Sequence, residues 1–467
     1  MRRDRTAVLH FIAQVVRSLA GFGTTLFAAR YFGAAGLGVY SQVLALLFWL
    51  KFPSNSLTTA ISKRMSESEE TTGHFTAGLL AALSYGLLVA VILVVFQSVV
   101  SGYLGAEATL PLIGLLLVNM TFDMVKSGFV GRKRVAISGW LGTAEQILRL
   151  LGQVAFVLGG ALVIGLVYGH VLSLFVFACL GLVLLRKQLR LPTRADFDDL
   201  RRFAQYSWLG DVKGLTLGWM DILVLGLFVT NDLVGIYQAS WTLASFLALT
   251  SKSIGTTLFP ELSELAAEDL YDDAKSLVGD AMLFAGVFLI PGFFGALVVG
   301  DRVLEVYDTE FAAGGTVLVL LIAARATHAF GDQLVNAING LDRPDVAFRI
   351  NAAFLTTNTV LNVVLVWQFG WYGAAVATLS STGVYLAGGW VGFRRLVGAL
   401  DFPFREVGYE LLAAVVMSGL LYLAVPSLPR TLPVTILAVF VAAGIYSVVL
   451  LTLSSRIRGK VRTVVGG

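Results

Sequence analysis

Residues 38–67 read GVYSQVLALLFWLKFPSNSLTTAISKRMSE, and residues 235–264 read GIYQASWTLASFLALTSKSIGTTLFPELSE. The two stretches align without a gap at an offset of 197 residues. Polar residues of the first stretch recur in the second, where Ser54, Ser56, Thr59, Ser66 and Glu67 match Ser251, Ser253, Thr256, Ser263 and Glu264. The chain therefore contains an internal repeat, and we expect its two halves to share one fold.

Apolar residues dominate the composition. Of the 467 residues, 57% are hydrophobic and only 14% are charged, against roughly 25% charged residues in soluble domains. Such a chain cannot cover its apolar residues with a polar shell, so we predict that lipid is its solvent. The net charge of +4 is explained by basic loops beside apolar segments, which argues against nucleic acid as a partner. The single cysteine, Cys179, excludes a disulfide within the chain.

The spacing of the apolar runs predicts an all-α integral membrane protein. A helix needs about 20 apolar residues to cross a bilayer, and counting such runs gives 14 transmembrane helices. Their expected limits are 8–30, 37–61, 74–97, 108–129, 135–157, 160–185, 204–229, 233–259, 277–299, 312–338, 346–367, 371–393, 407–425 and 432–454.

The distribution of basic residues sets the expected orientation. If the N-terminus lies inside, the inside segments carry 23 lysines and arginines and the outside segments carry 3. Because cytoplasmic loops are enriched in these residues, we predict a multi-pass protein of the cytoplasmic (plasma) membrane with both termini in the cytoplasm.

The repeat predicts the domain organisation. We expect two pseudo-symmetric six-helix bundles, residues 1–185 and 203–397, joined by a cytoplasmic linker at 186–202. Two additional transmembrane helices follow in residues 404–456. Since six is an even number, both bundles enter the membrane from the same side, which gives parallel repeats. No loop reaches the ~50 residues of a catalytic domain, and no catalytic motif appears, so we expect no enzyme.

Some of the charged residues within the expected spans, or at the end of one, have an opposite charge nearby. Glu145 and Arg149 are four positions apart, as are Asp345 and Arg349, and Asp123 lies three positions before Lys126. Residues at these spacings share one face of a helix, so we expect these pairs to neutralise each other and to be structural.

Four basic residues differ from these pairs. Arg17, Lys51, Lys213 and Lys252 have no acidic residue three or four positions away, and they recur in the first two helices of both halves. One alternative is that each pairs across helices, for instance with Asp211 or Asp332. The other is that together they line a water-filled cationic cavity for an anionic cargo such as a pyrophosphate, whose several acceptor oxygens suit point charges.

Several short motifs accompany the fourteen expected spans. They are ARYFG at 29–33, GLGVYS at 36–41, DIL at 221–223 and GIY at 235–237. With the span count, these motifs resemble the polysaccharide-type flippases, which belong to the multidrug/oligosaccharidyl-lipid/polysaccharide exporter superfamily.

The resemblance implies a function. It implies that the protein flips or exports a lipid-linked oligosaccharide on an undecaprenyl or dolichyl (pyro)phosphate carrier by alternating access. Members carry cations in the first, second and eighth helices of a central cavity, matched here by Arg17, Lys51 and Lys252, while Lys213 follows from the repeat. The expected partners are the lipid-linked oligosaccharide, membrane lipids and glycan-assembly enzymes, with the chain itself as a monomer.

Two other functions compete with this interpretation. A cation-coupled multidrug exporter of the same superfamily usually has twelve spans and a carboxylate-lined site, whereas here the first two spans carry bases and no acid. A scramblase or scaffold that does not transport would not need matched cations.

A sodium ion is the one cofactor that we expect. Asp221, Asn358, Asn362 and Thr378 supply carboxylate, amide and hydroxyl oxygens, which are the ligands of hard cations. The set resembles the sodium site suggested for some lipid-precursor flippases of this superfamily. The alternative is that the asparagines form ordinary hydrogen bonds between helices.

Overall fold

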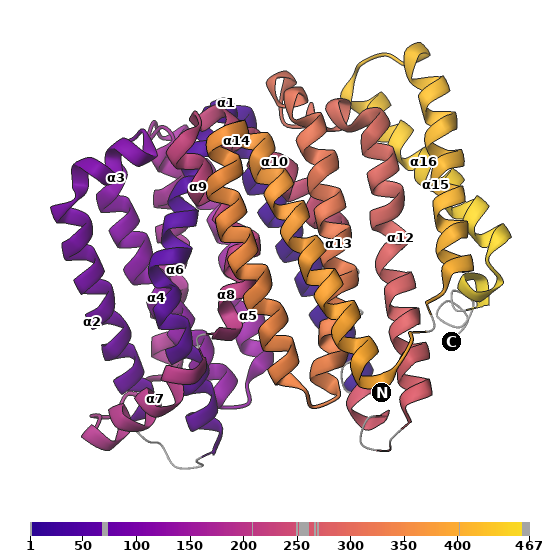
Figure 1. Cartoon of the computed structure of the whole chain (residues 1–467). Coiled ribbons are helices and arrows are strands. Elements are labelled where there is room, and N and C mark those ends of the chain that lie inside the picture. Colours follow the sequence, from indigo (N-terminus) through magenta and orange to yellow (C-terminus); the bar gives the residue numbers. More distant parts are fainter. Residues whose placement is uncertain are drawn as a thin grey trace. The chain divides into compact units, whose positions relative to one another are not determined.

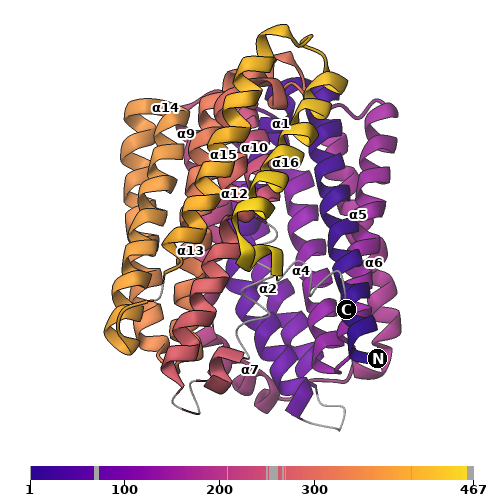
Figure 2. The same cartoon turned by 90° about the vertical axis from the view of Figure 1, so that its right-hand side faces the viewer.

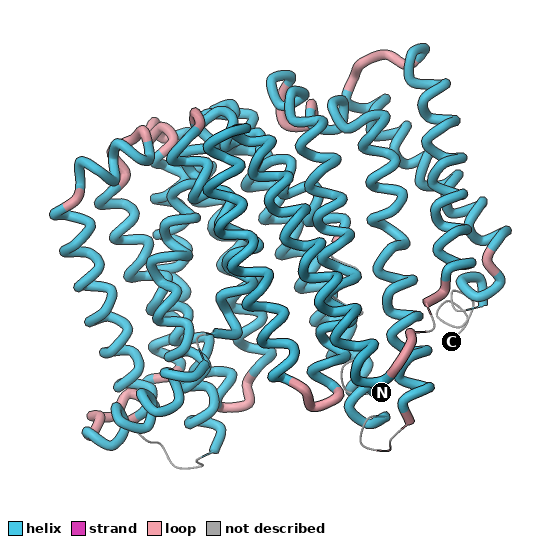
Figure 3. The backbone as a smooth tube through the Cα atoms, viewed as in Figure 1, coloured by secondary structure: helices cyan, strands magenta, loops and turns pink. Residues whose placement is uncertain are grey.

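The structure is a computed structural model that describes residues 2–67, 73–207, 209–248, 251, 261–265, 268, 270–400 and 402–459. All the regular elements among these residues are helices (Figure 3). The chain divides into two compact units, residues 1–235 and residues 236–467, and each unit is described by itself. The predicted boundaries of the two six-helix bundles, the linker and the added helices remain predictions.

The first unit, residues 1–235, contains all of the expected N-terminal bundle. Its helices are α1 (Arg2–Glu67), α2 (His74–Val95), α3 (Gln97–Leu104), α4 (Thr109–Gly131), α5 (Val135–Leu158), α6 (Ile164–Leu184), η1 (Arg186–Gln188), α7 (Arg194–Ser207), α8 (Leu209–Leu215), η2 (Thr216–Met220) and α9 (Asp221–Phe228). The helix α10 (Asn231–Leu247) begins in this unit and continues into the second (Figure 1).

The second unit contains α12 (Tyr271–Leu304), η3 (Thr309–Gly314), α13 (Gly315–Gly340), α14 (Pro344–Val397), α15 (Phe404–Ala424), η4 (Val425–Ser427) and α16 (Leu432–Leu453). Helices α15 and α16 pack on each other and on α12, side by side in Figure 2.

Ten helices among the described residues are long and apolar enough to cross a membrane. Two of them, α1 and α14, are each built from two legs, because Gly33 (φ 70°) and Gly370 (φ 56°) break the helical conformation. Positive φ values are readily adopted only by glycine. These breaks fall between the expected spans 8–30 and 37–61 and between 346–367 and 371–393.

Large apolar side chains lie on the outside of the helices. On α2, Val91 and Val95 are 62% and 70% exposed, and on α16 Phe440 is 71% exposed. A water-soluble protein would bury such a continuous apolar surface. The chain is therefore a multi-pass integral membrane protein, as its composition predicts.

The linker region forms the amphipathic helix α7, which packs across the ends of α1 and α2. Its start is fixed by a capping box, in which the Thr193 backbone N–H donates to Asp196 Oδ2 (2.7 Å) and the Asp196 N–H donates to Thr193 Oγ1 (3.4 Å). His74 Nε2, at the start of α2, lies 3.6 Å from Asp196 Oδ1. These contacts hold α7 against the transmembrane helices.

Candidate functional site

A cavity of about 530 Å³ lies inside the first unit. Its wall combines residues from the second leg of α1, from α4 and α5, and from α8 and η2. Its polar and aromatic lining includes Phe48, Lys51, Thr58, Thr59, Asp123, Lys126 and Trp219.

Lys51 lies at the wall of this cavity and is only 8% exposed. Its Nζ atom donates hydrogen bonds to Asp123 Oδ2 (2.6 Å) and to Asn119 Oδ1 (2.7 Å), and it lies 5.0 Å from the centre of the Phe48 ring. Lys51 therefore pairs with an acidic residue of another helix, which is the first of the two alternatives, although the partner is neither Asp211 nor Asp332. The partner is Asp123 of α4, which the spacing along the sequence had paired with Lys126 alone.

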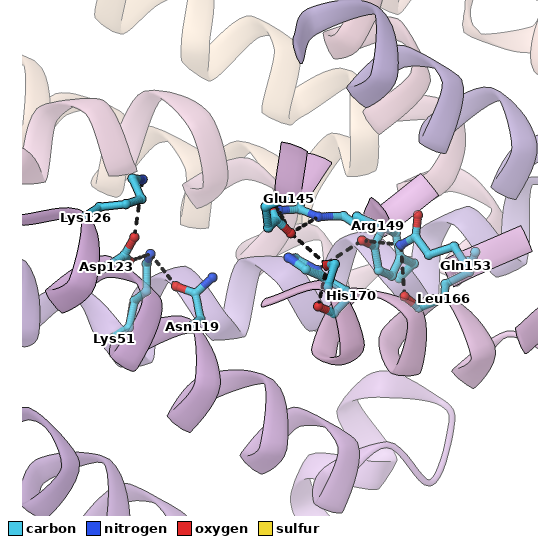
Figure 4. A network of polar contacts seen from close by, with 11 residues as sticks. Lys51, Asn119, Asp123, Lys126, Glu145, Arg149, Gln153, Leu166 and His170 are labelled. Atoms are coloured by element: carbon cyan, nitrogen blue, oxygen red, sulfur yellow. Dashed lines mark hydrogen bonds and ion pairs between the residues drawn. The ribbon is translucent and has the colours of Figure 1, made fainter. Parts of the chain in front are cut away.

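Lys126 shares the same carboxylate. Its Nζ atom lies 3.6 Å from Asp123 Oδ1, and its side chain is 35% exposed at the cavity. Figure 4 shows both lysines pointing at Asp123. The cavity therefore has two ammonium groups for one carboxylate, a net charge of +1 from these three residues, so its electrostatics favour an anion.

The cavity wall beside the lysines is amphipathic. The rings of Phe48 and Trp219 lie 4.7 Å apart, and Thr58, Thr59 and Ser138 add hydroxyl groups. Trp219 belongs to η2, a short π-helical segment in the expected seventh span. Such segments occur frequently at functional sites because they change the direction of side chains within a helix.

Of the other three predicted cations, the structure describes the side chain of Lys213 alone. Lys213 lies on α8, partly buried, next to Gly214, which lines the cavity. Arg17 lies on α1, but its side chain is outside the described part of the structure, and Lys252 is outside the described residues altogether. Only Lys51 is therefore placed at the wall of the cavity.

The predicted pair of Glu145 and Arg149 is confirmed. Arg149 donates from Nε to Glu145 Oε1 (3.0 Å) and from Nη2 to Oε2 (2.7 Å), and Ser173 Oγ donates to Oε1 (2.8 Å). The pair continues into a buried network, where Gln153 Nε2 donates to Tyr40 Oη (2.8 Å) (Figure 4). The geometry is bidentate and buried, which is typical of a structural ion pair.

The predicted pair of Asp345 and Arg349 is not the one that forms. Arg343 donates from Nε to Asp345 Oδ1 at 2.9 Å instead. Asp345 lies in the first turn of α14, and Arg343 precedes that helix, so the two face each other across the helix start. These hydrogen bonds raise the pKa of the exposed Arg343.

The residues of the predicted sodium site are all buried. Asp221 opens α9 in the first unit, directly after η2, while Asn358, Asn362 and Thr378 lie on α14 in the second. Asn362 Nδ2 donates to Asn358 Oδ1 (3.2 Å), and Asn358 Nδ2 donates to Ser381 Oγ (3.0 Å). The two asparagines thus share a face, as predicted, and Asn358 also forms a hydrogen bond between the two legs of α14. The sodium site itself stays a prediction.

The sequence interpretation missed a polar cluster in the second unit. The Arg325 guanidinium lies 5.1 Å from the centre of the Trp241 ring. Two turns further along α13, Asp332 Oδ1 accepts a hydrogen bond from Tyr385 Oη (2.9 Å), and His328 stacks on that ring at 5.1 Å. Like Lys51, Arg325 is a basic residue inside an expected span with no acidic residue three or four positions away. The same criterion would therefore have identified it.

The chain is similar to known proteins over most of its length. Residues 5–266 match the family described as polysaccharide biosynthesis protein. The chain is 31% identical to the probable flippase AglR of Haloferax volcanii, over 98% of this chain and 97% of that one. It is 26% identical to the probable low-salt glycan biosynthesis flippase Agl15 of the same organism, over 90% and 89%. Among solved structures, the lipid II flippase MurJ in an inward closed conformation matches with a TM-score of 0.80 and 14% identity, covering 95% of this chain and 98% of that one.

Proposed function

The chain belongs to the polysaccharide biosynthesis protein family, a family of membrane flippases and not of enzymes, and we propose that it translocates a lipid-linked oligosaccharide across the cytoplasmic membrane. The carrier would be a polyprenyl or dolichyl phosphate or pyrophosphate, and the glycan would serve a surface polysaccharide or glycoprotein. Two relatives that are named as probable flippases, and that are similar over most of the chain, support this proposal.

The observation that carries the proposal is the cationic cavity. Lys51 and Lys126 outnumber Asp123 at its wall, so a phosphate entering it would meet a net positive charge. A phosphate oxygen can replace part of the contact that Asp123 makes with the two ammonium groups, and such charge-assisted hydrogen bonds are strong. A cationic drug would be repelled by the same groups, which disfavours the multidrug exporter.

The rest of the cavity wall suits the sugar. The Phe48 and Trp219 rings offer an apolar face, and the neighbouring threonines offer hydroxyl groups that donate and accept. We propose that Lys213, Arg17 and Lys252 contribute further positive charge to the path of the phosphate.

The second unit offers a place for the hydrocarbon carrier. A cavity of about 310 Å³ lies between α10, α12, α13, α15 and α16, and its lining is mostly aliphatic and aromatic. Apolar groups such as Phe246, Phe288 and Met417 are suitable contacts for a polyprenyl chain.

We propose that the whole chain forms fourteen spans. The ten long helices include α1 and α14 with two legs each, and the expected seventh and eighth spans coincide with α8–η2–α9 and with α10. The two halves would rock as parallel repeats in alternating access, with both termini in the cytoplasm.

The test compares surface glycan in a deletion strain that carries the wild-type gene or variants. Lys51→Met should abolish glycan export and also destabilise the protein, because it leaves Asp123 with less compensation. The double variant Lys51→Met/Asp123→Asn removes both charges and should recover stability without recovering export.

The double variant decides between a binding and a structural role. If it exports glycan normally, Lys51 serves only to neutralise Asp123, and the cavity is not the phosphate site. Replacement of the exposed Arg458 by alanine is the control and should leave export unchanged. Drug resistance conferred on a sensitive host would favour the multidrug exporter.

A further inference from the structure

Two carboxyl groups lie on one face of α15, inside the second unit. Glu406 and Glu410 are four residues apart, and they are 6% and 0% exposed. Neither residue takes part in the cationic cavity or in the predicted sodium site.

The two groups differ in their partners. Glu406 Oε2 accepts a hydrogen bond from Ser454 Oγ, and Glu406 Oε1 lies 3.6 Å from Arg405 Nη2. Both oxygens of Glu410 are buried and have no hydrogen-bond partner within the described part of the chain. Only the deeper of the two groups therefore lacks compensation.

The surroundings of Glu410 are tightly packed and apolar. Gly286 of α12 faces it so closely that a Cβ atom there would come within 2.7 Å of Glu410 Oε2. On its own helix it precedes the core residues Ala413 and Met417. From α16, the Tyr446 hydroxyl is also buried without a hydrogen-bond partner in the described structure.

The basic groups of α15 and of the segment after α16 have other partners. Arg456, which follows α16, lies 2.6 Å from Asp280 of α12, and Arg405 lies beside Glu406 and over the Tyr409 ring. On α12, Lys275 lies 2.8 Å from Asp272, and Arg302 donates hydrogen bonds to the backbone carbonyl groups of Val425 and Leu428. Among the described residues, no basic side chain forms a hydrogen bond with Glu410. The contribution of α13 near Gly286 is the apolar ring of Phe330.

An ionised carboxylate in such a place loses its hydration and gains nothing in return, whereas the protonated form loses much less. We infer that Glu410 is a proton-binding site buried in the C-terminal helices, occupied at neutral pH while α15 packs on α12. Its ligand is a proton.

This assignment links the proton to helix packing. A charged Glu410 would require water beside it, and the close approach of Gly286 leaves no room for that water. Loss of the proton should therefore loosen α15 from α12, and the opposite movement should favour its return.

Infrared difference spectroscopy of the purified full-length protein in lipid vesicles tests the assignment. A protonated carboxyl group has a carbonyl stretch that a carboxylate lacks. At neutral pH we expect this band in the wild type and in Glu406→Gln, and we expect it to be missing from Glu410→Gln. If Glu410→Gln retains the full band, the proton is elsewhere and the assignment is wrong.

A stability measurement gives a second readout. Glutamine keeps the shape of a neutral carboxyl group and cannot ionise. Raising the pH should therefore lower the melting temperature of the wild type more than that of Glu410→Gln, with Glu406→Gln as the matched control. Parallel pH profiles for the wild type and Glu410→Gln would contradict the proposal.

Discussion

Gly38 and Gly235 lie in direct contact, and the contact is reciprocal. A Cβ atom on Gly38 would come 1.8 Å from the carbonyl oxygen of Asn231, and a Cβ atom on Gly235 would come 1.9 Å from that of Ala34. Asn231 lies four residues before Gly235, and Ala34 lies four residues before Gly38. The repeat offset of 197 relates Ala34 to Asn231 and Gly38 to Gly235, so the two close contacts involve equivalent positions of the repeat.

The reciprocal contact predicts that both glycines are required for stability. Alanine at either position should destabilise the protein by roughly 1–3 kcal/mol, because a methyl group would overlap backbone atoms that cannot move aside easily. The effects of Gly38→Ala and Gly235→Ala should be similar. Thermal unfolding in detergent measures them, and Gly139→Ala is the control because a Cβ there meets nothing within 4 Å. A neutral Gly235→Ala would contradict the close crossing.

The Glu145 network predicts a strong coupling between three residues. Arg149→Ala should destabilise the first unit by about 3 kcal/mol, since it leaves a buried carboxylate that retains only the hydrogen bond from Ser173. Ser173→Ala should cost about 1 kcal/mol. A double-mutant cycle of Glu145→Gln with Arg149→Ala measures the coupling. Additive effects would mean that the pair contributes little.

The cavity predicts different roles for its two lysines. Lys126→Ala should lower the rate of glycan export roughly tenfold, because it removes one charged hydrogen bond to the phosphate. It should have little effect on the stability of the protein. Lys51→Met should lower both the export rate and the stability, because Lys51 is buried against Asp123 whereas Lys126 is partly exposed. Export and melting temperature are measured together, with Lys63→Ala on the exposed end of α1 as the control. Unchanged export in Lys126→Ala would place the phosphate elsewhere.

The predicted sodium site gives an ion-dependence test. If Asp221, Asn358, Asn362 and Thr378 bind sodium, the melting temperature or transport rate of the wild type should rise with sodium concentration. Asp221→Asn should lose that dependence, because the amide carries no charge to attract the ion. Equal behaviour of the wild type in sodium and in an inert organic cation would count against the site.

The helical fold was largely predictable, because each span needs only local information. A run of apolar residues long enough for the bilayer must form a helix to satisfy its backbone, and Gly33 and Gly370 interrupt the two longest helices where the sequence places a turn. The Glu145–Arg149 pair was predictable for the same reason, since four residues on a helix bring two side chains to one face.

The cationic site was only partly predictable. The sequence singled out Lys51 as a buried base in an unusual place, and the structure puts it at the cavity wall. It could not identify Asp123 as the partner, because 72 residues separate them and no periodicity connects α1 with α4. Arg325 was missed although the same rule applied to it.

That this chain is helical, membrane-embedded and internally repeated can be read from its amino-acid sequence without a structure. Those properties follow from hydrophobicity, from the backbone's need for hydrogen bonds in lipid, and from residues that are neighbours along a helix. The tertiary structure alone decided that Lys51 meets Asp123, that Gly38 and Gly235 touch, and that Glu410 is buried against Gly286. Each depends on which helices pack together and on how each helix is rotated about its axis, and only long-range packing sets both.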